Sequence, residues 1–247
     1  MSEIQGFEQL KKYIEESDNI VFFGGAGVST ESGVPDFRSV DGLYHQHFKY
    51  PPETMLSHSF YVHHKKDFYD FYRQKLLAPN NGPNAAHKKL AQWEQEGKLK
   101  AVITQNIDGL HQAAGSKNVL ELHGSVLRNY CESCHEFYDL DYVADMKNAD
   151  KDGIPVCKKC GSPIKPDVVL YEEGLDMNVM QKAVEAITAA DVLIIGGTSL
   201  VVYPAAGLID YYRGNKLVLV NRDSTARDGV ADLIVKGSIG EIFSRLP

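Results

Sequence analysis

The sequence lacks a long apolar run and an excess of positive charge. None of its 247 residues lies in a stretch approaching the about 18 apolar residues of a membrane-spanning helix, and the N-terminal MSEIQGFEQLKKYIEE has no signal-peptide core. Acidic residues number 33 and basic residues 26, which gives a net charge of −7. This balance argues against a general binder of nucleic acid or anionic membranes. We therefore expect a cytoplasmic protein.

Cysteine is also scarce, and its placement is informative. The four cysteines form two CxxC pairs, Cys131/Cys134 and Cys157/Cys160. In a chain without a secretion signal, such pairs are more typical of zinc ligands than of disulfides. Four thiolates complete a tetrahedral site and leave no open position for a catalytic water. The pairs predict one structural Zn²⁺ per chain, with unliganded cysteines or a redox pair as the alternatives.

The segment NIVFFGGAGVSTESGVPDFRS, residues 19–39, joins a strand-like run to a glycine-rich turn. Ile20 to Phe23 is apolar, β-branched and aromatic, which predicts a strand. Gly25 and Gly27 form a GxG pattern that brings backbone N–H groups close to a phosphate. Thr30 replaces the third glycine of the dinucleotide fingerprint, and no acidic residue ends a second strand about 20 residues later. The pattern is a poor fit to an ordinary dehydrogenase, and a turn without a ligand stays the alternative.

Short apolar runs alternate with helical patterns along most of the chain, which predicts an α/β fold with a parallel sheet covered on both faces. An aromatic stretch after residue 37 reads as a helical or irregular insert, and 126–166 reads as a metal module. The expected strands are 20–23, 101–104, 119–122, 168–171, 192–195, 217–220 and 233–235. The expected helices are 3–16, 84–96, 108–114, 176–190, 202–212 and one from 239 onward.

Polar residues follow the ends of several expected strands. They are Gln105, Asn106, Asp108, His123, Thr198, Ser199, Asn221 and Arg222. Open α/β sheets bind ligands beyond the carboxyl ends of their strands, so we expect these side chains to gather there. Together they offer hydroxyls and amides for a phosphate, ribose or carboxamide, and an imidazole for proton transfer. Taken singly, each is as well explained as a turn former or a structural residue.

These motifs resemble those of the sirtuins of the bacterial type, which are NAD-dependent protein-lysine deacylases. The matching stretches are GAGVSTESGVPDFRS (25–39), TQNIDGLHQAAG (104–115), ELHGS (121–125), the CxxC pairs and GTSLVVYPAA (197–206). They occur in the family's order over nearly the whole chain.

The resemblance implies two domains. A Rossmann-like NAD-binding domain would comprise 1–40, 84–125 and 167–247. A small domain would combine a helical insert, 41–83, with a zinc-binding module of the ribbon type, 126–166. Acetylated lysine of a protein or peptide would enter between the two domains.

The resemblance also implies roles for individual residues. His123 and Asn106 would be catalytic. NAD would be bound by Gly25, Ala26, Gly27, Thr30, Asp36, Phe37, Arg38, Gln105, Asn106, Ile107, Asp108, His123, Gly197, Thr198, Ser199, Asn221, Arg222 and Ile239. The substrate would contact Val168, Val169, Tyr171 and Glu172, and zinc would be held by Cys131, Cys134, Cys157 and Cys160.

The activity implied is NAD-dependent removal of acetyl groups from protein lysines, with nicotinamide, O-acetyl-ADP-ribose and free lysine as products. A twisted, desolvated nicotinamide would leave, and the acyl oxygen would capture the sugar carbon. His123 would act as general base on a ribose hydroxyl, and Phe37 would keep out water. An NAD-dependent mono-ADP-ribosyltransferase and a non-enzymatic zinc-ribbon interaction module are the alternatives.

The chain departs from the family pattern in two places. It reads Tyr171-Glu172-Glu173 where the family commonly has Phe-Gly-Glu in the turn that pairs with the substrate backbone. Members that prefer succinyl or malonyl groups carry Tyr-x-x-Arg, whereas here Tyr69 is followed by Tyr72 and then Arg73. We therefore expect acetyl or another uncharged acyl group.

Overall fold

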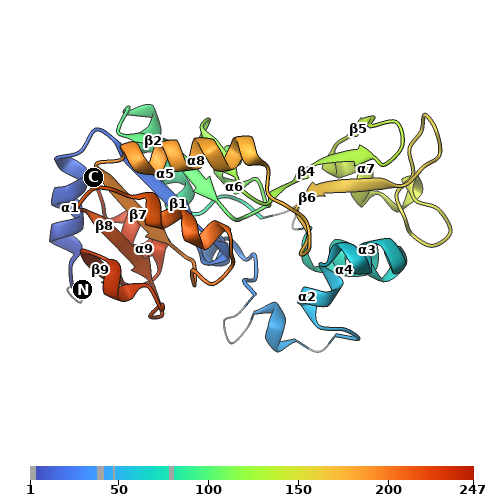
Figure 1. Cartoon of the computed structure of the whole chain (residues 1–247), viewed down its shortest axis with the longest axis horizontal. Coiled ribbons are helices and arrows are strands. Elements are labelled where there is room, and N and C mark those ends of the chain that lie inside the picture. Colours follow the sequence, from blue (N-terminus) through green and yellow to red (C-terminus); the bar gives the residue numbers. More distant parts are fainter. Residues whose placement is uncertain (1–3, 38–41, 47, 78–80) are drawn as a thin grey trace.

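The larger part of the molecule is a parallel sheet of six strands, seen in a computed structural model that describes residues 4–37, 42–46, 48–77 and 81–247 (Figure 1). The strands are β1 (Ile20–Gly24), β2 (Leu99–Thr104), β3 (Val119–Glu121), β7 (Val192–Gly196), β8 (Leu217–Asn221) and β9 (Leu233–Lys236). They lie in the order β3-β2-β1-β7-β8-β9, and every neighbouring pair is parallel. This is the doubly wound order, in which the strand order reverses between β1 and β7.

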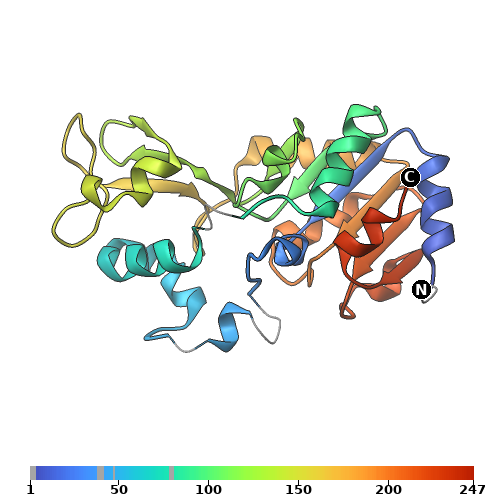
Figure 2. The ribbon, with the colours of Figure 1, turned by 180° about the vertical axis from the view of Figure 1, so that it is seen from behind.

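Helices cover both faces of this sheet. Successive strand residues point to opposite faces, so Phe22 packs in one core and Phe23 in the other. The Phe22 core includes α1 (Phe7–Glu15), α5 (Ala85–Gln95) and α9 (Ile239–Ser244). The Phe23 core includes α8 (Met177–Ala189) and a 3₁₀-helix, Ala205–Tyr211. Figure 1 shows α8 in front of the sheet, and Figure 2 shows α5 and α9 in front of it from behind. The predicted α/β architecture is confirmed.

The smaller part combines an antiparallel sheet with a group of helices. The sheet has the order β5-β4-β6, with β4 (Gly124–Cys131), β5 (Phe137–Tyr138) and β6 (Ile164–Val168). The helices are α2 (Pro52–Met55), α3 (His58–His63), α4 (Lys65–Lys75) and α7 (Leu140–Ala144). The short α6 (Leu110–Ala113) lies beside α5 in the larger part.

The two inserted segments share one hydrophobic core although they are far apart in the sequence. Phe68 and Tyr72 of α4 pack with Val126 of β4 and Ile164 of β6. Arg73 strengthens the contact, because its guanidinium donates hydrogen bonds to the carbonyl groups of Val143 and Gly153. The small sheet runs from residue 124 to residue 168; the domain boundaries given above stay predictions.

Several expected elements differ in the structure. The run 168–171 is not a strand of the parallel sheet, because β6 ends at Val168 and pairs antiparallel with β4. Its apolar residues Val168 and Leu170 are buried in the core of the smaller part instead. The expected helix 202–212 is a 3₁₀-helix, and the helix expected at 3–16 begins at Phe7, after Gly6 adopts a φ of +82°.

Within the described residues, none of the helices has the length and apolar character needed to cross a bilayer.

Asn84 fastens α5 to the turn after β1. Its side-chain oxygen accepts hydrogen bonds from the N–H groups of Ala86 and His87, and its amide nitrogen donates to the Val28 carbonyl at 2.7 Å. We expect Asn84→Ala to lower the free energy of unfolding by about 1–2 kcal/mol in urea denaturation, because a helix cap and a tertiary hydrogen bond are lost together. Asn178→Ala, on the exposed first turn of α8, is the control and should change it by less than about 0.5 kcal/mol. Equal effects would contradict the assigned role of Asn84.

Candidate functional site

A cavity of about 510 Å³ opens at the carboxyl ends of the parallel strands. The register aligns Gly24 with Thr104 and with Gly196, so the turns that follow β1, β2 and β7 meet at one edge. The lining of the cavity also includes the chain that follows β6. The cavity therefore lies at the reversal of strand order, where doubly wound sheets bind their ligands.

The sequence-predicted NAD and substrate residues that the structure describes all line this cavity. They are Gly25, Ala26, Gly27, Thr30, Asp36, Phe37, Gln105, Asn106, Ile107, Asp108, His123, Val168, Val169, Tyr171, Glu172, Gly197, Thr198, Ser199, Asn221, Arg222 and Ile239. Arg38, the remaining predicted residue, lies outside the described residues.

Two glycine turns form the floor of the cavity at the reversal point. The Gly27 N–H donates to the Gly197 carbonyl at 2.8 Å. A Cβ atom added at Gly27 would lie 2.8 Å from the Gly197 Cα, and one added at Gly25 would lie 2.7 Å from the Thr198 Cβ. The turns thus have no room for side chains, which suits a ligand that lies against backbone, such as a diphosphate.

The Asn221 side chain holds the second of these turns in place. Its Oδ1 accepts a hydrogen bond from the Thr198 N–H, and its Nδ2 donates to the Thr198 carbonyl, both at 3.1 Å. Gln105 contacts the same residue, because its Nε2 donates to the Thr198 hydroxyl at 3.2 Å. Ends of β2, β7 and β8 are therefore connected around one polar wall.

Asp108 is a half-buried carboxylate at the cavity edge. Its Oδ2 accepts a 2.7 Å hydrogen bond from the Ser29 hydroxyl, and its Oδ1 accepts one from the Leu110 N–H. Asn106 Nδ2 donates to the same Ser29 hydroxyl at 3.0 Å. Burial raises the pKa of Asp108 above its ordinary value, against the hydrogen bonds from Ser29 and Leu110, which favour the charged form. This group suits the recognition of a carboxamide.

Sequence reasoning missed Ser29 and Glu31, which both line the cavity. Ser29 lies inside the GAGVSTES motif, so the motif could have pointed to it. Glu31 accepts a hydrogen bond from the Gly240 N–H at 2.6 Å, which ties the glycine-rich segment to α9. Nothing in the sequence near Glu31 signals that distant partner.

His123 follows β3 and carries a defined ring orientation. Its Nδ1 lies 2.9 Å from the Gln105 carbonyl oxygen, which can only accept, so Nδ1 holds the proton and Nε2 is left as the basic atom. Burial lowers the pKa of His123, although the hydrogen bond to Gln105 opposes the shift. The ring is therefore neutral near pH 7 and suited to take up a proton.

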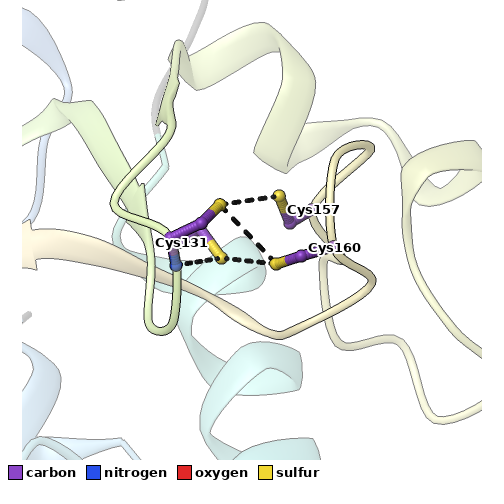
Figure 3. A group of neighbouring side chains, drawn as sticks. Cys131, Cys157 and Cys160 are labelled. Atoms are coloured by element: carbon purple, nitrogen blue, oxygen red, sulfur yellow. Dashed lines mark hydrogen bonds between the residues drawn. The ribbon is translucent and has the colours of Figure 1, made fainter.

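The four cysteines come together in the smaller part (Figure 3). The Sγ atoms of Cys131 and Cys160 are 3.4 Å apart, and Cys134 Sγ lies 3.6 Å from those of Cys157 and Cys160. A disulfide needs about 2.05 Å. Tetrahedral zinc with bonds of about 2.3 Å places its sulfur ligands about 3.8 Å apart, so the cluster fits Zn²⁺.

Hydrogen bonds to sulfur further suit a metal site. Tyr138 donates its hydroxyl proton to Cys157 Sγ at 3.1 Å, and the Lys159 N–H lies 3.4 Å from the same atom. Such donors stabilise the thiolate form, which is the form that binds a metal.

Comparisons with known proteins agree with this architecture. A family model described as the Sir2 family matches residues 25–204. A Clostridium acetobutylicum protein named NAD-dependent protein deacetylase is 60% identical over 237 residues, covering 95% of each chain. A Clostridium perfringens protein with the same name is 58% identical, covering 96% of this chain and 97% of its own.

Two solved structures extend the comparison. A Sir2 variant with a deacetylated p53 peptide and 3′-O-acetyl ADP-ribose has a TM-score of 0.88 at 37% identity, covering 97% of this chain and 96% of its own. Sir2 with a p53 peptide and NAD⁺ has a TM-score of 0.84 at 38% identity, with the same coverage.

The metal cluster yields a prediction about stability. Cys157→Ser removes one of four ligands, so we expect zinc content to fall well below about one ion per chain and the melting temperature to drop, because the bound metal organises the smaller part. Mass spectrometry of the native protein and thermal unfolding measure the two. Ser133→Ala, within the same CxxC turn as Cys134, is the control and should keep both values. Unchanged folding with loss of a single chemical step would contradict a structural role for the metal.

Proposed function

The chain belongs to the Sir2 family, and we propose that it is an NAD-dependent protein-lysine deacetylase that releases nicotinamide, O-acetyl-ADP-ribose and free lysine. The observation that carries the proposal is the convergence of glycine turns, half-buried amide and carboxylate groups and one neutral imidazole on a single cavity. The names of the Clostridium relatives and the ligands of the similar Sir2 structures support the same activity.

The nucleotide would lie across the reversal of strand order. The floor at Gly25 and Gly27 would take the diphosphate, and the loops after β7 and β8, with Ser199, Asn221 and Arg222, would hold the adenosine half. Asn106, Ile107 and Asp108 would enclose the nicotinamide, with the carboxamide facing Asp108. When bound, NAD supplies an electrophilic ribose carbon and nicotinamide as the leaving group.

His123 would act as the general base. The Gln105 carbonyl accepts the Nδ1 proton, so Nε2 is the basic atom of the ring and would take up a proton from a ribose hydroxyl. Phe37 packs edge-on against Tyr44, with ring centroids 5.7 Å apart. This aromatic pair would exclude water from the side of the cavity next to the reacting centre.

The acyl group would be acetyl or another uncharged group. Tyr69 and Arg73, which lie where the succinyl-preferring pattern would be sought, are engaged elsewhere: Tyr69 donates to the Ile164 carbonyl, and Arg73 donates to the Val143 and Gly153 carbonyls. Neither is among the described residues that line the cavity.

The remaining expectations also form part of this proposal. We expect a cytoplasmic location, in keeping with reduced metal-binding cysteines, and no general nucleic-acid binding at a net charge of −7.

The decisive experiment incubates the purified protein with NAD and an acetyl-lysine peptide. We expect NAD-dependent release of unmodified peptide and O-acetyl-ADP-ribose, slower turnover of the matched succinyl peptide, and a loss of about 100- to 10,000-fold in kcat for His123→Ala. His63→Ala, an exposed histidine on α3, is the control. ADP-ribose left on protein would favour the transferase, and the absence of NAD turnover together with indifference to His123→Ala would favour a non-enzymatic module.

The protonation state of His123 sets the pH dependence. Because burial lowers the pKa of His123 below its ordinary value of 6.5, the ring stays neutral at pH 7 and protonates only in more acidic solution. The protonated ring cannot act as a base, so kcat/KM should fall on the acidic side with its midpoint below pH 6.5. A pH profile measured with saturating NAD tests this, and a midpoint above that value would contradict it.

A further inference from the structure

The chain that follows β6 is held from two sides where it lines the cavity. The Val169 N–H donates to the carbonyl of His123 at 3.0 Å. Tyr171 donates its N–H to the Leu56 carbonyl at 2.9 Å and accepts a hydrogen bond from the His58 N–H at 3.0 Å. This stretch therefore connects the backbone of the candidate general base to the helical insert.

At Glu172 the backbone adopts a conformation that side chains disfavour. Its φ is +76°, in the left-handed region that glycine occupies most readily. Such a conformation persists where the surroundings hold it, and at functional sites it is often part of how the site works. Because Glu172 lines the cavity, its backbone shapes the wall that would face the acyl-peptide.

The Glu172 carboxylate is itself bound to α3. Its Oε2 accepts hydrogen bonds from the Ser59 N–H at 2.9 Å and from the Ser59 hydroxyl at 2.6 Å. The hydroxyl of Ser59, and then its N–H, lower the pKa of Glu172, so the carboxylate is charged near pH 7. The strained residue is thus fixed by the side chain that a glycine would lack.

Glu173 provides a second anchor in the same turn. Its Oε1 lies 2.8 Å from His58 Nδ1, and its Oε2 accepts hydrogen bonds from the Lys165 ammonium at 3.2 Å and the Leu170 N–H at 2.8 Å. The turn is thereby attached to α3 on one side and to β6 on the other.

We propose that Glu172 is a positioning residue, whose carboxylate latches the turn Tyr171–Glu173 to Ser59 and so presents a preformed wall to the acylated peptide. The inference rests on the proposed function, since it concerns how that enzyme holds its protein substrate. A wall that is already ordered loses less conformational freedom when the peptide binds, so the latch contributes to peptide affinity. The nucleotide would bind at the glycine turns, which do not contact Glu172, so its affinity should not depend on these hydrogen bonds.

The variants separate three contributions of Glu172: its hydrogen bonds to Ser59, its negative charge and its strained backbone. Glu172→Ala removes the latch, Glu172→Gln keeps an acceptor for Ser59 without the charge, and Glu172→Gly removes the latch together with the strain. Ser59→Ala removes one donor from the opposite side. Glu185→Ala, an exposed glutamate on α8 that bonds Gln181, is the control outside the cavity.

Steady-state kinetics with an acetyl-peptide then tests the latch. For Glu172→Ala we expect KM for the peptide to rise about three- to tenfold, while KM for NAD and kcat change less than about twofold. Glu172→Gln should stay near wild type, Glu172→Gly should still raise KM, and Ser59→Ala should raise it less. The double variant Ser59→Ala/Glu172→Ala should be no worse than Glu172→Ala, because both remove the same contact.

Clear outcomes would overturn the proposal. These are an equal rise in KM for NAD, independent effects of the two substitutions in the double variant, or a Glu172→Gly enzyme with unchanged or lower KM. Glu172→Gln could also raise KM for the peptide as much as Glu172→Ala does, and only for peptides with basic residues beside the lysine. That result would show that the Glu172 carboxylate contacts the peptide through its charge. If the wild-type protein fails to deacetylate, the proposed function fails; fluorescence anisotropy with a labelled acetyl-peptide still tests the latch, as Glu172→Ala should weaken binding.

Discussion

The close approach of two glycine turns is the constraint on which the rest of the site depends. Gly27 and Gly197 follow β1 and β7, the two strands between which the strand order reverses, and their backbones are joined by a hydrogen bond. A side chain at Gly27 or Gly197 would collide with the opposite turn, so the two turns can approach this closely only because both residues are glycine. The absence of side chains also forms the floor of the cavity, so one packing requirement serves both the sheet and the proposed diphosphate site.

Around this floor, the polar groups work as connected sets. Ser29 joins Asn106 to Asp108, Gln105 orients the ring of His123 through its carbonyl, and the carbonyl of His123 in turn receives the N–H of Val169. The proposed nucleotide half, proton acceptor and peptide wall are therefore linked through short hydrogen bonds of side chains and backbone. This arrangement holds the imidazole in place relative to the wall that would face the acylated peptide.

How much the sequence could predict depended on whether a signal was local. Strands β1, β7 and β8 are continuous buried apolar runs, and α5 begins at a capping asparagine and ends before Gly97, so their positions were readable. The run 168–171 is as apolar as those strands at three of its four positions, and only tertiary packing decides that Val168 and Leu170 are buried in the smaller core. Ser29 forms hydrogen bonds with Asn106 and Asp108, which are 77 and 79 positions away in the sequence. Glu172 likewise bonds the distant Ser59, so the sequence pattern could not predict these contacts.

The smaller part is built from two segments that leave the large sheet at strand ends and return to it, yet bury one common core. A change of length or sequence within either segment is therefore absorbed on that side of the molecule, while the strands that carry the glycine floor keep their register. Such an arrangement lets substrate preference diverge over evolution without rebuilding the nucleotide half. The contacts between the two segments, such as Arg73 with the carbonyls of Val143 and Gly153, then oblige them to diverge together.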